Sequence, residues 1–293
     1  MPETMRVKVC IVGYRDWAFD IFKHLQFEDV AKLKSVGVEF NWVTFVGNNF
    51  DNESSFLIEN PTEMGEFSNW LMNEDFDFIV FAGWSWIIKD EFINTYNCLC
   101  IHPSDINERR GGTPIQNQIL SGADSAIVTL FKMTSKLDWG PILDKRKIRL
   151  DGYIPEILSR ITDAGVVSIR LVIQDLLSGS EVRESDTILG APGKLGKRRH
   201  TEDSEIKLSV IEKMSFDNID RLARSLTGPY PRLCILECDS YETVFYVDSV
   251  VNLGNLQHST NDNNKNYQYL SIKCKDANIM AVGKYGMKKN GTR

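Results

Sequence analysis

The stretch CLCIHPSDINERRGGTPIQNQILSGADSAIVTLFKMTSKLDWGPIL, residues 98–143, carries the strongest information in the chain. Its apolar run at 98–101 predicts a short buried strand that ends just before His102, and the run at 126–133 predicts another strand. A turn with the sequence Lys-Leu-Asp-Trp-Gly follows, and it contains Asp138. Because open α/β sheets bind ligands at the carboxyl ends of their strands, we expect these two side chains to share one crevice.

The sequence on either side of this stretch alternates short apolar runs with segments of helical periodicity, which is typical of βαβ units. Further strands are predicted at 7–12, 40–46, 78–81 and 143–150, and helices at 16–33, 62–72 and 154–177. We therefore predict an α/β class protein with a Rossmann-like, mostly parallel sheet and helices on both faces.

A change of composition at 178–205, toward Gly, Ser, Lys, Arg and Pro, predicts a long loop and a domain boundary. We expect a catalytic domain at 1–180, a loop at 181–205 that contributes to the acceptor site, and a smaller C-terminal domain at 206–293. A helix at 215–226 capped by Ser215 and strands at 233–236, 243–250 and 267–274 predict an α+β or β-rich C-terminal domain. The Asn-rich segment at 261–266 predicts a turn or loose loop.

Composition narrows the range of partners. The 293 residues carry a net charge of −6, so the protein as a whole lacks the positive electrostatic field that attracts nucleic acid. This net charge argues against a large RNA partner. No segment approaches the roughly 20 apolar residues of a membrane span. The six cysteines show no CxxC or Cys/His spacing, so neither a metal site nor a disulfide framework is predicted. A reduced, cytoplasmic setting is the expectation.

The informative stretch contains several residues in a recurring order: His102, Pro103, Ser104, Arg110, Gly111, Pro114, Leu137, Asp138 and Gly140. This pattern resembles the formyltransferase family, which includes glycinamide ribonucleotide, methionyl-tRNA and sugar N-formyltransferases. Members carry Asn-x-His followed by Pro or Gly and Ser, then an Arg-Gly…Pro loop, and later Leu-Asp-x-Gly. The resemblance extends more loosely over 6–180, and it implies an enzyme that uses 10-formyltetrahydrofolate as formyl donor.

Acyl transfer to an amine requires a base, a group that positions the base, and donors aimed at the developing oxyanion. We expect His102 to act as the base, and Asp138 to position it and help protonate the leaving folate nitrogen. Cys100 stands where the family carries asparagine. Because a thiol is a weak hydrogen-bond donor, this departure predicts slower chemistry unless protonated His102 or a held water supplies the bond. A covalent role for Cys100 stays open as an alternative.

The resemblance also indicates where the donor binds. In the family the pterin lies against a strand-to-helix loop, and the matching residues here are Trp84, Ser85, Trp86, Ile87 and Ile88, with Asp138 nearby. The apolar and aromatic content of this loop suits a flat heterocycle. Packing of Trp84 and Trp86 in the core or between subunits is the alternative. A nicotinamide cofactor is disfavoured because Gly13 is alone where a dinucleotide fingerprint needs three glycines.

The acceptor site is expected to combine Pro103, Ser104, Arg110 and Gly111 with Arg199, Glu202, Asp203 and Tyr230. The run at 196–204 is similar to an Arg-rich loop of sugar N-formyltransferases, including the one that acts on a UDP-linked aminoarabinose. The turn at 226–231 resembles their Pro-aromatic-Pro turn. Arginines suit a diphosphate and an aromatic ring suits a nucleobase.

These likenesses predict a nucleotide-linked amino sugar as acceptor, with dTDP-4-amino-4,6-dideoxyglucose as first guess and surface polysaccharide such as O-antigen as its destination. A homodimer is the family expectation. Two alternatives remain. The first is a methionyl-tRNA formyltransferase. The second is a catalytically dead protein that binds a sugar nucleotide, and the replacement of the family asparagine by Cys100 is the observation that supports it.

Overall fold

The computed structural model describes residues 6–28, 37–180, 192–237, 243–255 and 267–287. The chain divides into two compact units. The first comprises Met1–Pro114, Ser125–Arg149 and Leu158–Gly196, and the second comprises Ile115–Asp124, Leu150–Ile157 and Lys197–Arg293. The predicted loop at 261–266 and residues 181–191 of the predicted loop at 181–205 lie outside the described residues.

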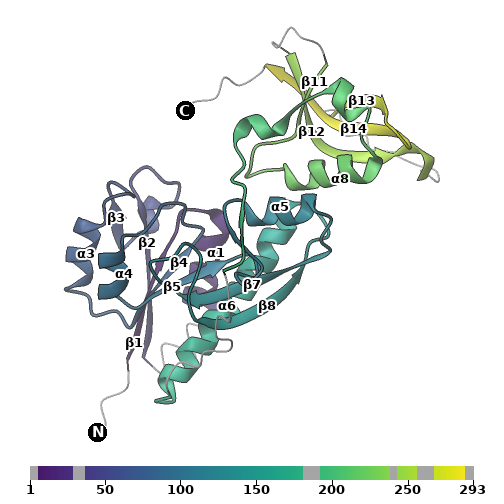
Figure 1. Ribbon diagram of the computed structural model, residues 1–293. Coiled ribbons are helices and arrows are strands. Elements are labelled where there is room, and N and C mark those ends of the chain that lie inside the picture. Colours follow the sequence, from purple (N-terminus) through teal and green to yellow (C-terminus); the bar gives the residue numbers. More distant parts are fainter. Residues whose placement is uncertain (1–5, 29–36, 181–191, 238–242, 256–266, 288–293) are drawn as a thin grey trace. The chain divides into compact units, whose positions relative to one another are not determined.

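The first unit is built on a sheet whose strands follow the order β3-β2-β1-β4-β5-β7-β8 (Figure 1). These strands are β1 (Val7–Val12), β2 (Val38–Phe45), β3 (Phe56–Ile58), β4 (Phe78–Ala82), β5 (Cys98–His102), β7 (Ser125–Lys132) and β8 (Ile142–Arg149). The strands from β3 to β5 run parallel, whereas β7 and β8 are antiparallel to their neighbours. The prediction of a mostly parallel α/β sheet is confirmed.

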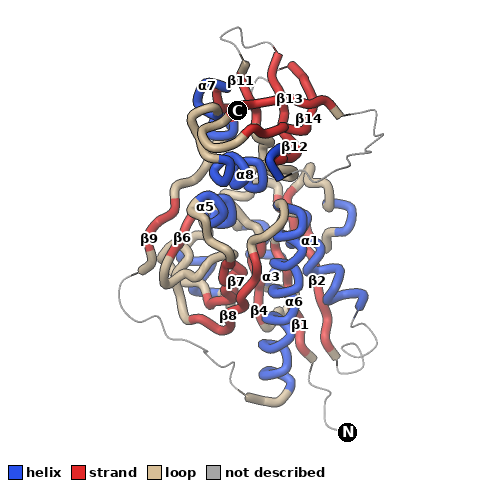
Figure 2. Tube along the Cα trace, turned by 90° about the vertical axis from the view of Figure 1, so that its right-hand side faces the viewer, coloured by secondary structure: helices blue, strands red, loops and turns tan. Residues whose placement is uncertain are grey.

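Helices cover both faces of this sheet (Figure 2). On one face α3 (Gly65–Leu71) and α4 (Asp90–Thr95) bury Phe67 and Phe92 against the apolar side chains of β1, β2, β4 and β5. On the other face lie α1 (Asp16–Lys23) and α6 (Ile154–Leu177), which are joined where the Thr162 hydroxyl donates to the Trp17 carbonyl at 3.1 Å. The helix predicted at 154–177 therefore matches α6 along its whole length.

Several elements differ from the sequence expectation. The helix predicted at 16–33 is α-helical only to Lys23, after which His24–Glu28 forms a π-helical turn, η1. Short pieces that no periodicity indicates are β6 (Arg109–Gly111), which pairs in parallel with β9 (Lys194–Gly196), and the 3-10 turns η2 (Asp51–Glu53), η3 (Thr201–Ser204) and η4 (Leu253–Asn255). Elements of three or four residues are too short to show a period.

The second unit contains a sheet in the order β10-β11-β12-β14-β13, antiparallel except for the β10–β11 pair. Its elements are α5 (Pro114–Leu120), β10 (Glu205–Lys207), α7 (Leu208–Ile211), α8 (Phe216–Ser225), β11 (Cys234–Leu236), β12 (Thr243–Asn252), β13 (Gln268–Lys273) and β14 (Asn278–Met287). Ser215 caps α8 as predicted, because its hydroxyl accepts from the Asn218 amide at 3.4 Å.

Strand β14 was absent from the sequence prediction, although it pairs with both β12 and β13. Two glycines, Gly283 and Gly286, lie within it and weaken its β propensity. Gly283 has a packing reason, since a Cβ there would lie 1.9 Å from the Tyr246 carbonyl oxygen. Close backbone contact opposite a bulge in β12 therefore explains why an interior strand carries glycine.

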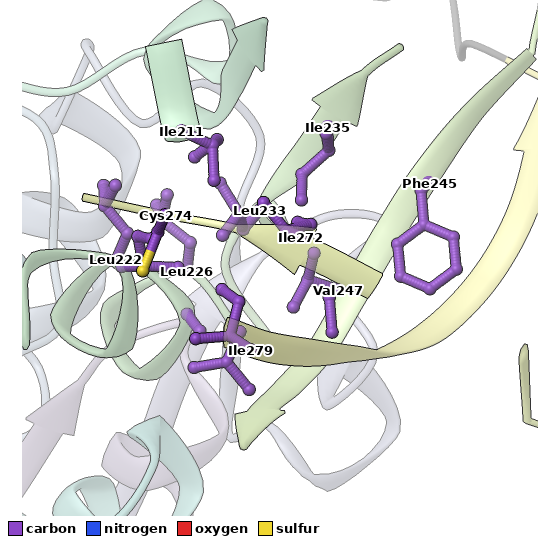
Figure 3. Packing of buried hydrophobic residues seen from close by; sticks show 14 residues of the cluster. Ile211, Leu222, Leu226, Leu233, Ile235, Phe245, Val247, Ile272, Cys274 and Ile279 are labelled. Atoms are coloured by element: carbon purple, nitrogen blue, oxygen red, sulfur yellow. The ribbon is translucent and has the colours of Figure 1, made fainter. Parts of the chain in front are cut away.

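The core of the second unit lies between α7, α8 and one face of the sheet (Figure 3). Leu222 of α8 and Leu226, the residue directly after that helix, point toward the strands, where Phe245 and Ile279 are fully buried. This packing accounts for the amphipathic pattern of the helix, whose apolar residues recur at helical spacing. Across the part of the chain described, no helix is long and apolar enough to cross a membrane.

Replacing Phe245 with alanine should lower the free energy of unfolding by about 3–5 kcal/mol, because it empties a buried aromatic site. The matched control is Tyr269→Ala on the same sheet. The Tyr269 side chain is 50% exposed, so its loss should change stability by no more than about 0.5 kcal/mol. Urea titration followed by circular dichroism measures both, and equal losses would contradict the assignment of the two sheet faces.

Candidate active site

Strand β5 delivers two of the predicted site residues to one face of the sheet. Side chains two residues apart in a strand share a face, so Cys100 and His102 point the same way. Cys100 pairs across the sheet with Phe131 and packs against a small cluster formed by Ile106, Phe131 and Ile142. The His102 side chain is buried, with 8% of the residue exposed, and among the described residues nothing hydrogen-bonds to its Nε2 atom.

Asp138 reaches the same place from the turn between β7 and β8. Its Oδ2 atom accepts a hydrogen bond of 2.8 Å from the Gly111 amide and lies 3.7 Å from His102 Nδ1. That distance is too long for a hydrogen bond and short enough for a strong charge effect. The two residues that sequence analysis expected in one crevice are therefore neighbours in the first unit.

The surroundings set the protonation of the site. Burial lowers the pKa of the His102 imidazole below its ordinary value of 6.5, and the Asp138 carboxylate partly opposes this shift. The imidazole is therefore neutral at pH 7. Burial, with the same carboxylate, raises the pKa of the Cys100 thiol well above 9.0. Since the thiolate is the reactive form, this environment works against a covalent role for the cysteine.

The residues predicted to hold the donor follow β4. The Trp84 and Trp86 rings have centroids 5.0 Å apart, and both lie near Tyr14, whose hydroxyl is 2.6 Å from the Ser85 hydroxyl oxygen. Ile88 is buried, whereas Ile87 is 81% exposed at the surface of the loop. Buried Trp84 Nε1 is without a hydrogen-bond partner among the described residues.

Sequence analysis missed two members of this aromatic cluster, Tyr14 and Phe45. The Phe45 ring lies 5.5 Å from Tyr14 and 5.3 Å from Trp86. Both residues are at the carboxyl ends of their strands, Tyr14 two residues after β1 ends and Phe45 as the last residue of β2. Their positions in the sequence could have identified them as candidate site residues, because parallel strands bring their carboxyl ends to one edge of the sheet.

The residues predicted to contact the acceptor in the first unit are partly engaged within the protein. Buried Ser104 donates from its hydroxyl to the Arg109 carbonyl at 2.7 Å. Arg110 donates to the carbonyls of Gly193 and Leu137, at 3.0 and 2.6 Å. Pro103, between His102 and Ser104, is partly exposed, and the amide of Gly111 is used by Asp138.

The remaining predicted acceptor residues belong to the second unit. In the loop that enters η3, the Asp203 carboxylate accepts from the His200 amide at 2.9 Å and pairs with Lys197 at 3.1 Å. Arg199 donates to Asn117 Oδ1 at 3.1 Å. Glu202 is exposed within η3, and the Tyr230 amide bonds the Thr227 carbonyl in the turn before β11.

Asn117 of α5 was not anticipated as part of this loop. Its amide nitrogen donates to the Lys197 carbonyl at 2.8 Å, and its amide oxygen accepts from Arg199. The loop is thus braced from within its own unit. Within the described ranges, no three His, Cys, Asp or Glu side chains gather closely enough to hold a metal ion.

Comparison with known proteins gives a consistent result for the N-terminal half of the chain. Residues 18–159 match the family described as formyl transferase. Methionyl-tRNA formyltransferase of Rickettsia prowazekii is 35% identical over 158 residues, covering 50% of this chain and 52% of the relative. That of Rickettsia bellii is 34% identical over 103 residues, 34% of each chain. The alignments thus span about half or less of these relatives.

Solved structures resemble a larger part of the chain. Methionyl-tRNA formyltransferase from Clostridium thermocellum superposes with a TM-score of 0.63 at 22% identity, covering 85% of this chain and 95% of that one. HypX from Aquifex aeolicus in complex with tetrahydrofolic acid gives 0.67 at 15% identity, with 95% and 44% covered. A sugar N-formyltransferase from a Shewanella species gives 0.58 at 18%, with 82% and 96% covered. At these identities the likeness establishes the fold.

The pair formed by His102 and Asp138 makes a direct prediction. Asp138→Asn should lower the pKa of His102 further, because it removes the negative charge that partly offsets burial. Histidine side-chain NMR across a pH series measures the change, and only four histidines need assignment. Asp105→Asn is the control, since the Asp105 carboxylate pairs with Lys145 at 3.3 Å. An unchanged or raised His102 pKa in Asp138→Asn would contradict the electrostatic account.

Proposed function

We propose, from the premise that residues 18–159 belong to the formyl transferase family, that this protein transfers a formyl group from 10-formyltetrahydrofolate to an amine. The observation that carries the proposal is the buried His102 with its unpartnered Nε2, beside a carboxylate fixed by a backbone amide. A base and the group that orients it are the parts that amine acylation requires.

The protein's residues would divide the work as follows. The amine nitrogen attacks the formyl carbon, and His102 Nε2 takes the proton that the amine loses as the new C–N bond forms. The same proton is then available to the folate nitrogen as its bond to the formyl carbon breaks, so charge and atoms balance. Asp138 favours the tautomer with hydrogen on Nδ1, which leaves the Nε2 lone pair free.

The chemistry of the loop at 84–88 in the first unit suits the formyl donor. The family uses 10-formyltetrahydrofolate, which supplies the formyl carbon. The loop at 84–88 offers a buried, unpartnered indole N–H on Trp84 and an exposed apolar side chain at Ile87, which suit the polar edge and the flat face of a pterin. Both features support the assignment of this loop to the donor.

For the acceptor, the α-amine of methionyl-tRNA is the favoured class. The two relatives compared above are methionyl-tRNA formyltransferases, one of them 35% identical over 158 residues. The charge argument against RNA also weakens when the chain is divided. Residues 1–196 hold 19 Lys and Arg against 28 Asp and Glu, whereas residues 197–293 hold 15 against 12. The acidic total thus comes from the part that contains the formyl transferase family match.

A nucleotide-linked amino sugar is the second candidate. The observation that favours it is the loop braced by Asn117, which fixes Arg199 through its Nε, because a guanidinium suits the forked hydrogen bonds that a diphosphate accepts. Tyr230, in the following turn, supplies a ring that could stack on a nucleobase.

The acceptor test pairs the purified protein and 10-formyltetrahydrofolate with methionyl-tRNA in one reaction and a panel of dTDP- and UDP-linked 3-amino and 4-amino sugars in others. Mass spectrometry should detect one added formyl unit on methionyl-tRNA, and His102→Gln should abolish the gain. If only a sugar gains the formyl unit, the proposed acceptor class is wrong and the proposal of formyl transfer stands. No gain on any amine would end the proposal of formyl transfer.

Cys100 allows a second test of the chemistry. Cys100→Asn should raise turnover, by up to about 10²-fold, because an amide is a better donor to the developing oxyanion than a thiol that stays protonated. Cys100→Ala is the control and should leave turnover near the wild-type rate. Complete loss of activity in Cys100→Ala would instead indicate a covalent role. Inactivity of the wild type and Cys100→Asn with intact ligand affinity would favour a binding protein.

A further inference from the structure

We propose that Arg110 is a positioning residue, whose guanidinium holds the turn of Asp138 so that the carboxylate stays beside His102. The inference rests on the proposed function for its catalytic meaning. The contacts that carry it lie wholly within the first unit. Sequence analysis assigned Arg110 to the acceptor, and the structure points to a different use of the same side chain.

The guanidinium joins two segments that are far apart in the chain. Its Nε donates to the Gly193 carbonyl at 3.0 Å, and its Nη1 donates to the Leu137 carbonyl at 2.6 Å. The charged head also lies 5.8 Å from the centroid of the Trp139 ring. Arg110 therefore contacts the residues immediately before and immediately after Asp138.

The turn needs support from outside because its conformation is unfavourable by itself. Asp138 has a φ of +43°, in the left-handed region that side chains other than glycine seldom occupy. Two residues later, Gly140 packs so closely that a Cβ would lie 1.7 Å from the Lys132 carbonyl oxygen. The turn is thus fixed at Gly140 by backbone packing and at Leu137 by Arg110.

The backbone of the same strand completes the arrangement. Gly111, the residue after Arg110, donates its amide to Asp138 Oδ2, the oxygen that lies 3.7 Å from His102 Nδ1. Strand β6 is itself fixed by its parallel pairing with β9. Because one dipeptide holds both the backbone and the carboxylate of the turn, a shift of Arg110 would displace the oxygen that faces the imidazole.

The chemistry of the contact requires arginine. A guanidinium presents donors in a rigid fork and can reach two carbonyls in fixed directions, whereas lysine is a point charge on a flexible stem. Arg110→Lys therefore keeps the charge and loses the geometry. The matched control is Arg109→Lys, since the neighbouring Arg109 side chain has no hydrogen bond or ion pair with any described residue.

The experiment compares Arg110→Lys, Arg110→Gln, Arg109→Lys and the wild type. Three quantities are measured: kcat and KM with 10-formyltetrahydrofolate and the accepted amine, the pKa of His102 by NMR, and hydrogen exchange of the Gly111 amide. Both Arg110 variants should lose about 10²-fold in kcat, the order expected for displacement of a catalytic group by about 1 Å, with little change in KM. Their Gly111 amide should exchange faster, and their His102 pKa should fall below that of the wild type.

Other outcomes separate this inference from the proposed function. In Arg110→Lys, the KM for the acceptor could rise while kcat and the His102 pKa stay unchanged and the Gly111 amide stays protected. That result would show that Arg110 binds the substrate directly, and it would overturn the positioning role. If the wild type transfers no formyl group at all, the proposed function fails. The two NMR readouts still decide whether Arg110 holds the turn. Arg110→Gln serves the same purpose if Arg110→Lys does not fold.

Discussion

The central physical constraint in this protein is the approach of one carboxylate to one buried imidazole. Burial removes water from around His102 and disfavours its charged form, and the Asp138 carboxylate opposes that effect. The carboxylate is in turn fixed by the Gly111 amide. The imidazole is therefore neutral, with its Nδ1 atom facing Asp138 and its Nε2 atom without a hydrogen-bond partner among the described residues. The Nε2 atom can accept a proton.

The sheet explains how residues far apart in sequence meet at this point. Strands β4 and β5 are parallel neighbours, so Trp84 and His102 emerge from the same edge. Strand β7 runs antiparallel to β5, so the connection between β7 and β8 starts beside the amino end of β5, where the Met133 amide donates to the Cys98 carbonyl at 2.8 Å. Asp138 lies in this connection, and its Oδ2 atom is 3.7 Å from His102 Nδ1, so the connection folds back from the amino end of β5 toward its carboxyl end.

Sequence reasoning succeeded where periodicity is long or a motif is dense. It predicted α6 at its full length, the alternation of strands in the first unit, and the meeting of His102 with Asp138. It could not find β14, whose glycines serve backbone contact, or the short pair β6 and β9. The sequence also does not reveal that the Arg110 side chain donates hydrogen bonds to the Gly193 and Leu137 carbonyls. A sequence shows which donor groups are present, but it does not show which acceptors they reach.

The electrostatics of the site suggest an order of events during the proposed reaction. Before transfer, His102 is neutral and the Cys100 thiol is protonated, so Asp138 supplies the one negative charge among the three side chains. A negative charge developing on the formyl oxygen would be repelled by that carboxylate. Once the imidazole has taken the amine proton it becomes a cation, and the repulsion is offset close to the reacting atoms. Proton transfer to His102 thus has to accompany the build-up of charge, and the weakness of the Cys100 donor makes the site depend on that coupling.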